Sequence, residues 1–259
     1  MRLHRIQALL LKFWYQSVGD IGRMFDIFYW PVIGILFFGF TAKYVQHLSN
    51  DNGIILFILG GLMLWTLFQR VQQDVSVYLL DDFWSRNVSN TFITPITEGE
   101  LFTAVSIVGV IRSLIGFAVM SLIGWIGYSF NIYSGGFMPF LFSIPLFLFA
   151  WALGIALIGM IYRYGTSIQV FAWSISFMLQ PIAAMTYPIT TLPIFMQKVA
   201  LATPLYYSFE GFRQAFLGTF NMSFFIIATV LGFLYTGLGY WYFVRSIKKA
   251  KKTGLITNY

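Results

Sequence analysis

The sequence predicts an all-α membrane protein with six transmembrane helices and both chain ends in the cytoplasm. Of the 259 residues, 58% are apolar and only 10% are charged, whereas a soluble domain has about 45–50% apolar and about 25% charged residues. The charged residues also divide the chain into apolar intervals close to the roughly 20 residues that a helix needs to cross the hydrocarbon core. We therefore expect a single transmembrane domain over residues 1–259.

Residues 1–25 predict an amphipathic helix that lies in the membrane interface and leads into the first span. Apolar and polar side chains recur on its opposite faces: Leu3, Ile6, Leu10, Phe13 and Trp14 on one, and Arg2, Arg5, Lys12 and Gln16 on the other. Asp20, Arg23 and Asp26 precede the first long apolar stretch, which has no small-residue cleavage site. This pattern differs from a cleavable signal peptide, so we expect the first span to be retained.

The first two spans are expected at residues 26–46 and 54–72. The first reaches span length if Lys43 and His47 extend their polar ends to the interface. The second ends near Arg70, although its helix could continue into water. Residues 70–100 form the longest polar stretch of the chain. We expect that stretch to be a cytoplasmic loop on which a partner could dock.

Between Arg112 and Arg163 there are 50 uncharged residues, too many for one crossing at 1.5 Å per residue. Asn, Ser, Gly and Pro cluster at residues 129–139 and predict a turn there. The last four spans are then 101–128, 137–162, 167–187 and 222–245, followed by a basic cytoplasmic tail at 246–259. The fifth must end around Pro181, Pro188 or Pro193, because each proline removes a backbone donor.

The segment 188–218 is apolar but too interrupted for a full crossing. Pro193 and the pair Thr203-Pro204 each look like a helix start, since proline suits the first helical position. Thr203 is expected to cap the free amides of the second helix. We therefore predict two short helices that form a re-entrant hairpin on the external side, between spans five and six.

The orientation follows from the lysines and arginines on each side of this arrangement. Twelve lie on the side of the termini, namely Arg2, Arg5, Lys12, Arg23, Arg70, Arg86, Arg163, Arg245, Lys248, Lys249, Lys251 and Lys252, and three on the other, Lys43, Lys198 and Arg213. The termini are therefore expected in the cytoplasm. Arg112 is the one charge expected within a span. It either extends to the interface or serves a substrate or a neighbouring helix.

Motifs for catalysis are absent from the sequence. There is no G-x-x-x-x-G-K-[ST] loop for phosphate, no H-E-x-x-H and no G-x-S-x-G. The only histidines, His4 and His47, are expected on opposite sides of the membrane, and there is no cysteine. We therefore expect no enzyme activity, no bound metal and no cofactor. The net charge of +7 is spread over the chain without a dense basic face, which argues against nucleic acid.

Three stretches together resemble the type-2 ATP-binding-cassette (ABC) exporter permeases. The first is the amphipathic N-terminal helix that leads into Phe28-Tyr29-Trp30-Pro31. The second is Ile93-Thr94-Pro95-Ile96-Thr97 with Glu98 and Glu100, which opens the third span. The third is Thr203-Pro204-Leu205-Tyr206-Tyr207 followed by Glu210-Gly211-Phe212-Arg213, with threonine where asparagine is commoner. Their order along the chain fits the family, and the resemblance covers essentially the whole chain.

The resemblance implies a permease dimer in complex with two ATP-binding subunits, which bind the ATP and Mg. It places a coupling helix at about Asp81 to Asn90, with Phe83 and Trp84 as the apolar knob. Its polar rim would be Asp81, Asp82, Arg86 and Asn87. The alternative is a solvated loop whose aromatic rings rest on the membrane.

The resemblance also places Glu210 and Arg213 in the external hairpin. Three residues apart on a helix, they can pair at membrane depth. The alternative is an exposed pair of little energetic weight.

The expected function is an export permease of the plasma membrane, or of the inner membrane in a Gram-negative bacterium. It would supply the translocation path as a homodimer or heterodimer and couple to a separate ATPase. Two other functions stay open: a membrane scaffold or assembly subunit without a substrate, and a secondary carrier driven by an ion gradient. Drugs, lipids, lipid-linked glycans and peptides are all possible cargo, because permeases of this type share a scaffold and differ in their path linings.

Overall fold

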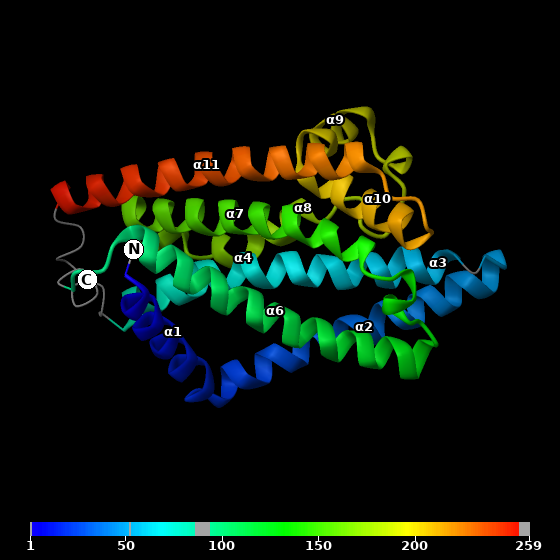
Figure 1. Ribbon diagram of the computed structural model, residues 1–259, viewed down its shortest axis with the longest axis horizontal. Helices are drawn as coiled ribbons and strands as arrows, with labels where there is room; N and C mark the ends of the chain where they lie inside the picture. The colour runs from blue at the N-terminus through cyan, green and yellow to red at the C-terminus, as the bar shows by residue number, and fades with distance from the viewer. Residues whose placement is uncertain (1, 52, 86–93, 254–259) are drawn as a thin grey trace.

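The computed structural model describes residues 2–51, 53–85 and 94–253, and every regular element in these ranges is helical (Figure 1). The long helices are α1 (Leu3–Val18), α2 (Ile21–Ser49), α4 (Gly61–Trp84), α6 (Glu98–Tyr128), α7 (Ser143–Tyr164) and α11 (Met222–Thr253). The short ones are α3 (Gly53–Ile55), α8 (Phe171–Leu179), α9 (Ile194–Ala202) and α10 (Pro204–Phe216). A π-helical turn covers Leu56–Gly60, and 3₁₀ turns cover Ile132–Gly135, Met138–Phe142, Thr166–Ile168 and Ile189–Thr191.

Five helical segments of the described residues are long and apolar enough to cross a membrane. They are Ile21–Ser49, Gly53–Trp84, Glu98–Tyr128, Met138–Tyr164 and Met222–Ala250. Several such segments in one chain are typical of a multi-pass membrane protein.

Two helix starts follow directly from local sequence. Asp20 precedes α2, and its carboxylate accepts a hydrogen bond from the amide of Gly22 at 2.8 Å. Thr97 and Glu100 form a capping box at the start of α6, in which each side chain accepts from the other residue's amide. These contacts satisfy amides that have no partner inside their own helix.

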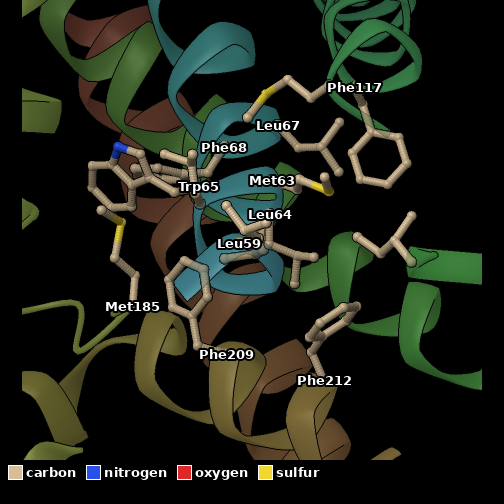
Figure 2. Packing of buried hydrophobic residues seen from close by; sticks show 14 of the residues in the cluster. Leu59, Met63, Leu64, Trp65, Leu67, Phe68, Phe117, Met185, Phe209 and Phe212 are labelled. Atoms are coloured by element: carbon tan, nitrogen blue, oxygen red, sulfur yellow. The ribbon is translucent and has the colours of Figure 1, made fainter. Parts of the chain in front are cut away.

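Helix α4 lies at the centre of the bundle, packed against α6 on one side and α7 on another. Figure 2 shows its buried side chains among Phe117 of α6 and Phe209 and Phe212 of α10. Since lipid is as apolar as leucine, contacts of this kind stabilise through close packing more than through removal from water. α4 is therefore the element against which the others are positioned.

The two ends of the bundle differ. Helix α1 and the last turns of α11 lie at one end of the long axis, and α9 and α10 lie at the other (Figure 1). We call these the terminal end and the hairpin end. The separation agrees with the expected sidedness, but it does not place either end in the cytoplasm.

The helix of the second predicted span, 54–72, continues past Arg70, as the sequence allowed. Helix α4 continues to Trp84, so most of the expected polar loop at 70–100 that the structure describes is helical and buried. The physical reason is that the charged side chains of α4 form ion pairs with residues of other helices, so they need no contact with water. The described part of the predicted tail, residues 246–253, is helical as well, since α11 runs on to Thr253.

The fifth predicted span, 167–187, is not one continuous helix. Helix α8 has nine residues, and it ends just before Pro181 as expected for proline. Trp173 nevertheless stacks on Trp84 at the last turn of α4, whereas the carbonyl of Met185 lies against Gly61 at its first turn. Residues 173–185 therefore run antiparallel to α4 along its length.

Residues 188–218 contain two short helices, as predicted. α9 begins after Pro193, and α10 begins at Pro204. The capping role expected for Thr203 is wrong, because its hydroxyl donates to the carbonyl of Ala200 at 2.9 Å and makes no cap bond to α10. The N-terminal helix is also shorter than expected, since α1 ends at Val18 and α2 begins at Ile21.

Candidate functional site

A groove of about 580 Å³ lies between α2, α4 and α8. Arg112 of α6 also lines this groove. The lining residues are Arg23, Asp26, Trp30, Pro31, Ile33, Gly34, Phe37, Phe38, Leu62, Trp65, Thr66, Gln69, Arg70, Gln73, Asp74, Val77, Tyr78, Arg112, Trp173, Phe177 and Gln180. Most of these residues belong to segments that are long and apolar enough to span a membrane.

Helix α4 contributes a polar stripe to the floor of this groove. Between Gly61 and Tyr78 every side chain of α4 is buried except those of Thr66, Gln69, Gln73 and Val77, which are half-buried. Their spacing of three and four residues places them on one helical face. All four line the groove. Between Gly61 and Tyr78, α4 therefore turns its accessible face, which carries two glutamine amides, to this space.

The side walls of the groove are aromatic. Trp30 and Phe37 of α2 stand on one wall, and Trp173 and Phe177 of α8 on the other. All four side chains are exposed in the single chain. The groove thus combines a polar floor with apolar, ring-shaped walls.

Two ion pairs, one of them fully buried, close the groove toward the terminal end. Arg112 donates to Asp74 at 2.8 Å and to the hydroxyl of Tyr78 at 3.1 Å, and Arg70 pairs with Asp26 at 2.6 Å. Arg112 and Asp74 are 8% and 5% exposed. Charges at this depth are costly unless they are paired. The two pairs therefore connect α4 to α6 and to α2.

These contacts decide between the two expectations for Arg112. Its guanidinium does not extend to the interface but pairs with a neighbouring helix. Arg112 is the one charge that the sequence predicts within a span, and Arg70 and Asp74 lie near it in Gly53–Trp84, another segment long and apolar enough to cross a membrane. A signal was present in the sequence, since Val71, Val75 and Tyr78 continue the apolar helical spacing beyond Arg70.

The acidic residues of the predicted coupling segment face inward. Asp81 pairs with Arg23 of α2 at 2.5 Å, and Asp82 pairs with Lys12 of α1 at 2.7 Å. Both carboxylates are buried. They therefore hold α1 and the start of α2 on the last turns of α4.

The two aromatic residues of that segment have different surroundings. Phe83 is 5% exposed and packs on Tyr162 of α7, with 4.8 Å between ring centroids, so it does not project as the expected knob. Trp84 is 48% exposed, stacks on Trp173 and donates to the Gln169 side chain at 2.8 Å. Arg86 and Asn87 lie outside the described residues. Trp84 is thus the described aromatic residue of this segment that a partner could contact.

The second family-like motif ties α1 to α6. The Glu100 carboxylate accepts from the backbone amide of Arg2 at 2.7 Å and lies 3.7 Å from the guanidinium of Arg5, which also donates to the carbonyl of Pro95. Glu98 is the first residue of α6. The motif therefore positions the N-terminal helix over the start of α6.

The third motif anchors the turn after α8. Arg213 is buried, lies 3.4 Å from Glu210 and donates to the carbonyl of Ala184 at 3.1 Å and to that of Met185. Its guanidinium also lies over the ring of Phe57 in the π-helical turn, 3.5 Å from the centroid. Burial lowers the pKa of Arg213 to about 10, so it remains charged at neutral pH.

The contacts of Arg213 show that the pair with Glu210 is not the exposed pair considered as an alternative. The other two residues of this motif lie in the same helix. Pro204 is the first residue of α10, and the ring of Tyr207 contacts Phe224 of α11. The third motif therefore fixes α10 to its neighbours on both sides.

No protein-family model matches this chain, and no curated protein does. In the described ranges no three His, Asp or Glu side chains lie close enough together to hold a metal ion. The sequence motifs and the groove thus carry the functional argument. Of the residues in the groove, sequence reasoning singled out Arg112 but missed the amides of Gln69, Gln73 and Gln180, which meet only when α8 packs along α4.

Proposed function

We propose that this chain is the permease subunit of an ATP-driven exporter of the type-2 ABC class. The observation that carries the proposal is the groove between α2, α4 and α8, whose floor is polar although most of its lining belongs to segments long and apolar enough to span a membrane. A polar face directed to lipid would be costly, so such a face indicates a path for water or for a polar cargo. The groove would form part of the translocation path.

The course of the chain beside α4 supports six crossings. Residues 173–185 follow α4 from its last turn to its first, so this segment would cross together with α8 despite its short helix. Five long segments and this one would place both termini on the same side, which the count of lysines and arginines favours as the cytoplasmic one. The exposed aromatic rings of α2 and α8 would face a second permease copy, which would close the path from the open side.

The terminal end is where an ATP-binding subunit would dock. Trp84 is exposed there, and the segment that follows it contains Arg86 and Asn87. The pairs of Asp81 with Arg23 and of Asp82 with Lys12 join this region to α1 and α2. A displacement of the last turn of α4 by the bound ATPase would therefore be transmitted to α2, which lines the groove. ATP and Mg would be held by the partner.

The charges in the groove argue against an ion-coupled carrier. Asp26 and Asp74 are the carboxylates that line it, and each already pairs with an arginine. A proton or sodium carrier needs an acid that can change its occupancy during the cycle. A scaffold without cargo would in turn have no need of a polar stripe at membrane depth.

The test is affinity purification of the chain from its native membrane, with vanadate-sensitive ATP hydrolysis as the readout. We expect an ABC ATPase to copurify with the wild type. We expect Trp84→Ala to lower the bound ATPase about tenfold or more, because a buried aromatic anchor at an interface is commonly worth about 2 kcal/mol or more.

Trp125→Ala is the matched control, since Trp125 is an exposed tryptophan near the C-terminal end of α6, away from the proposed docking site. It should retain the ATPase. Absence of ATP hydrolysis from the wild-type complex would overturn the proposal, and equal loss in both variants would overturn the docking site at Trp84.

A further inference from the structure

We propose that the groove between α2, α4 and α8 binds an uncharged, hydroxyl-rich head group of the kind carried by a glycolipid or lipid-linked glycan. This inference names the cargo of the path and so rests on the proposed function. It follows from the hydrogen-bonding groups on the floor, from the shape of the walls and from the balance of charge.

The floor offers hydrogen bonds that the protein itself does not use. Gln69 and Gln73 of α4 and Gln180 after α8 line the groove from facing elements. None of these three side chains has a hydrogen-bond partner within the described residues. Each amide offers two donors and one acceptor oxygen. Hydroxyl groups both donate and accept, so a sugar can satisfy all of them.

A fourth free group lies at the closed end of the groove. One carboxylate oxygen of Asp74 bonds to Arg112, while the other, Oδ2, is buried without a hydrogen-bond partner. An orphaned buried acceptor of this kind calls for a donor from a ligand or from water. A sugar hydroxyl can supply that donor without introducing a charge.

The walls fit the apolar faces of sugar rings. Trp30 and Trp173 present exposed indole rings on opposite sides of the groove, and Phe177 adds a third ring. Indole rings combine a large flat apolar surface with a polar edge. They can cover the C–H face of a sugar or an acyl chain while the amides bind the hydroxyls.

The charges disfavour ionic cargo. Arg23, Arg70 and Arg112 line the groove with Asp26 and Asp74, and each arginine pairs with a carboxylate. An anion would have to displace an aspartate from its arginine, and a cation would have to displace an arginine. Breaking the buried pair of Arg112 and Asp74 is the most costly of these changes. An uncharged head group avoids that cost.

The experiment uses the purified chain in phosphatidylcholine nanodiscs and three photoreactive probes that share one dodecyl diazirine tail. Their heads are maltose, phosphocholine and trimethylammonium. Labelled peptides are located by mass spectrometry, and each dissociation constant is taken from a labelling titration. We expect the maltoside to label α2, α4 and α8 with the lowest dissociation constant of the three.

The double variant Gln69→Leu/Gln73→Leu should weaken maltoside binding about tenfold or more, which corresponds to the loss of one or two hydrogen bonds. Gln7→Leu, an exposed glutamine on α1, is the matched control and should bind as the wild type. Trp30→Ala tests the wall independently and should also weaken binding. An unchanged thermal unfolding midpoint shows that each variant is folded.

Equal labelling by all three probes, tighter binding of a charged probe, or no effect of the glutamine variant would each overturn the inference. These results are separate from the ATPase test. If an ATPase copurifies but the maltoside is not preferred, the cargo class is wrong and the permease stands. If the maltoside is preferred but no ATPase copurifies, the glycan site stands and the exporter does not.

Discussion

At the scale of single residues, charges at membrane depth are stabilised by partners from other helices. Arg112 of α6 and Asp74 of α4 are 38 positions apart in the sequence and are joined at 2.8 Å. The pair need not stabilise the fold relative to apolar residues, but either charge alone would be left uncompensated. Removal of one partner should therefore cost more than removal of both.

We predict that Arg112→Leu or Asp74→Leu alone destabilises the protein by about 3–5 kcal/mol, as for other broken buried pairs. The double variant should be more stable than either single one. Thermal unfolding in detergent micelles measures the order of the three. Arg245→Leu is the control, because Arg245 is exposed and stacks on Trp241, and it should shift the midpoint little. Additive losses in the double variant would show that the two charges act independently.

At the scale of elements, α8 is placed by close approach to α4 and not by its own length. The contact is made at Gly61 by the segment that follows α8, because a Cβ at this position would overlap the carbonyl of Met185. That carbonyl is also held by Arg213. The turn after α8 is therefore locked between α4 and α10, which fixes one wall of the groove.

We predict opposite effects for the same substitution at two helical glycines. Gly61→Ala should destabilise by about 1–3 kcal/mol, as for an overpacked core, and lower the unfolding midpoint. Gly127→Ala in α6 meets nothing within 4 Å, so it should be neutral or stabilise by up to about 1 kcal/mol through helix propensity. The check is the pair of unfolding midpoints. A similar shift at both positions would falsify the contact between Gly61 and Met185.

At the scale of the whole molecule, the bundle has a terminal end and a hairpin end with different charges. The count of lysines and arginines favours the terminal end in the cytoplasm. The chain contains no cysteine, so single cysteines introduced at each end report sidedness without background.

We predict that Asp51→Cys and Lys198→Cys react with a membrane-impermeant maleimide on intact cells. His4→Cys and Lys248→Cys should react only after the membrane is permeabilised. All four native side chains are exposed in the chain, so a lack of reaction reports the membrane and not burial in the protein. The reverse pattern would contradict the predicted orientation. Labelling of all four on intact cells would show that the two ends do not lie on opposite sides.

The sequence by itself determined the helical, membrane-spanning class and the place of most helices. The long apolar run at 101–128 and the capping box of Thr97 and Glu100 are local features, so they can be read along the chain. The two short helices after Pro193 were predicted for the same reason.

Only the tertiary structure decided that α4 continues to Trp84 and that α8 is a helix of nine residues followed by an irregular segment. In the sequence, the charged residues between 70 and 82 predict a solvated loop. In the folded chain each of them pairs with a residue of another helix: Arg70 with Asp26, Asp74 with Arg112, Asp81 with Arg23 and Asp82 with Lys12. The groove was also hidden from the sequence, because Gln69 and Gln180 belong to elements about a hundred residues apart. Helix formation depends on neighbours within a few positions. Charge compensation and the alignment of free amides depend on residues that only folding brings together.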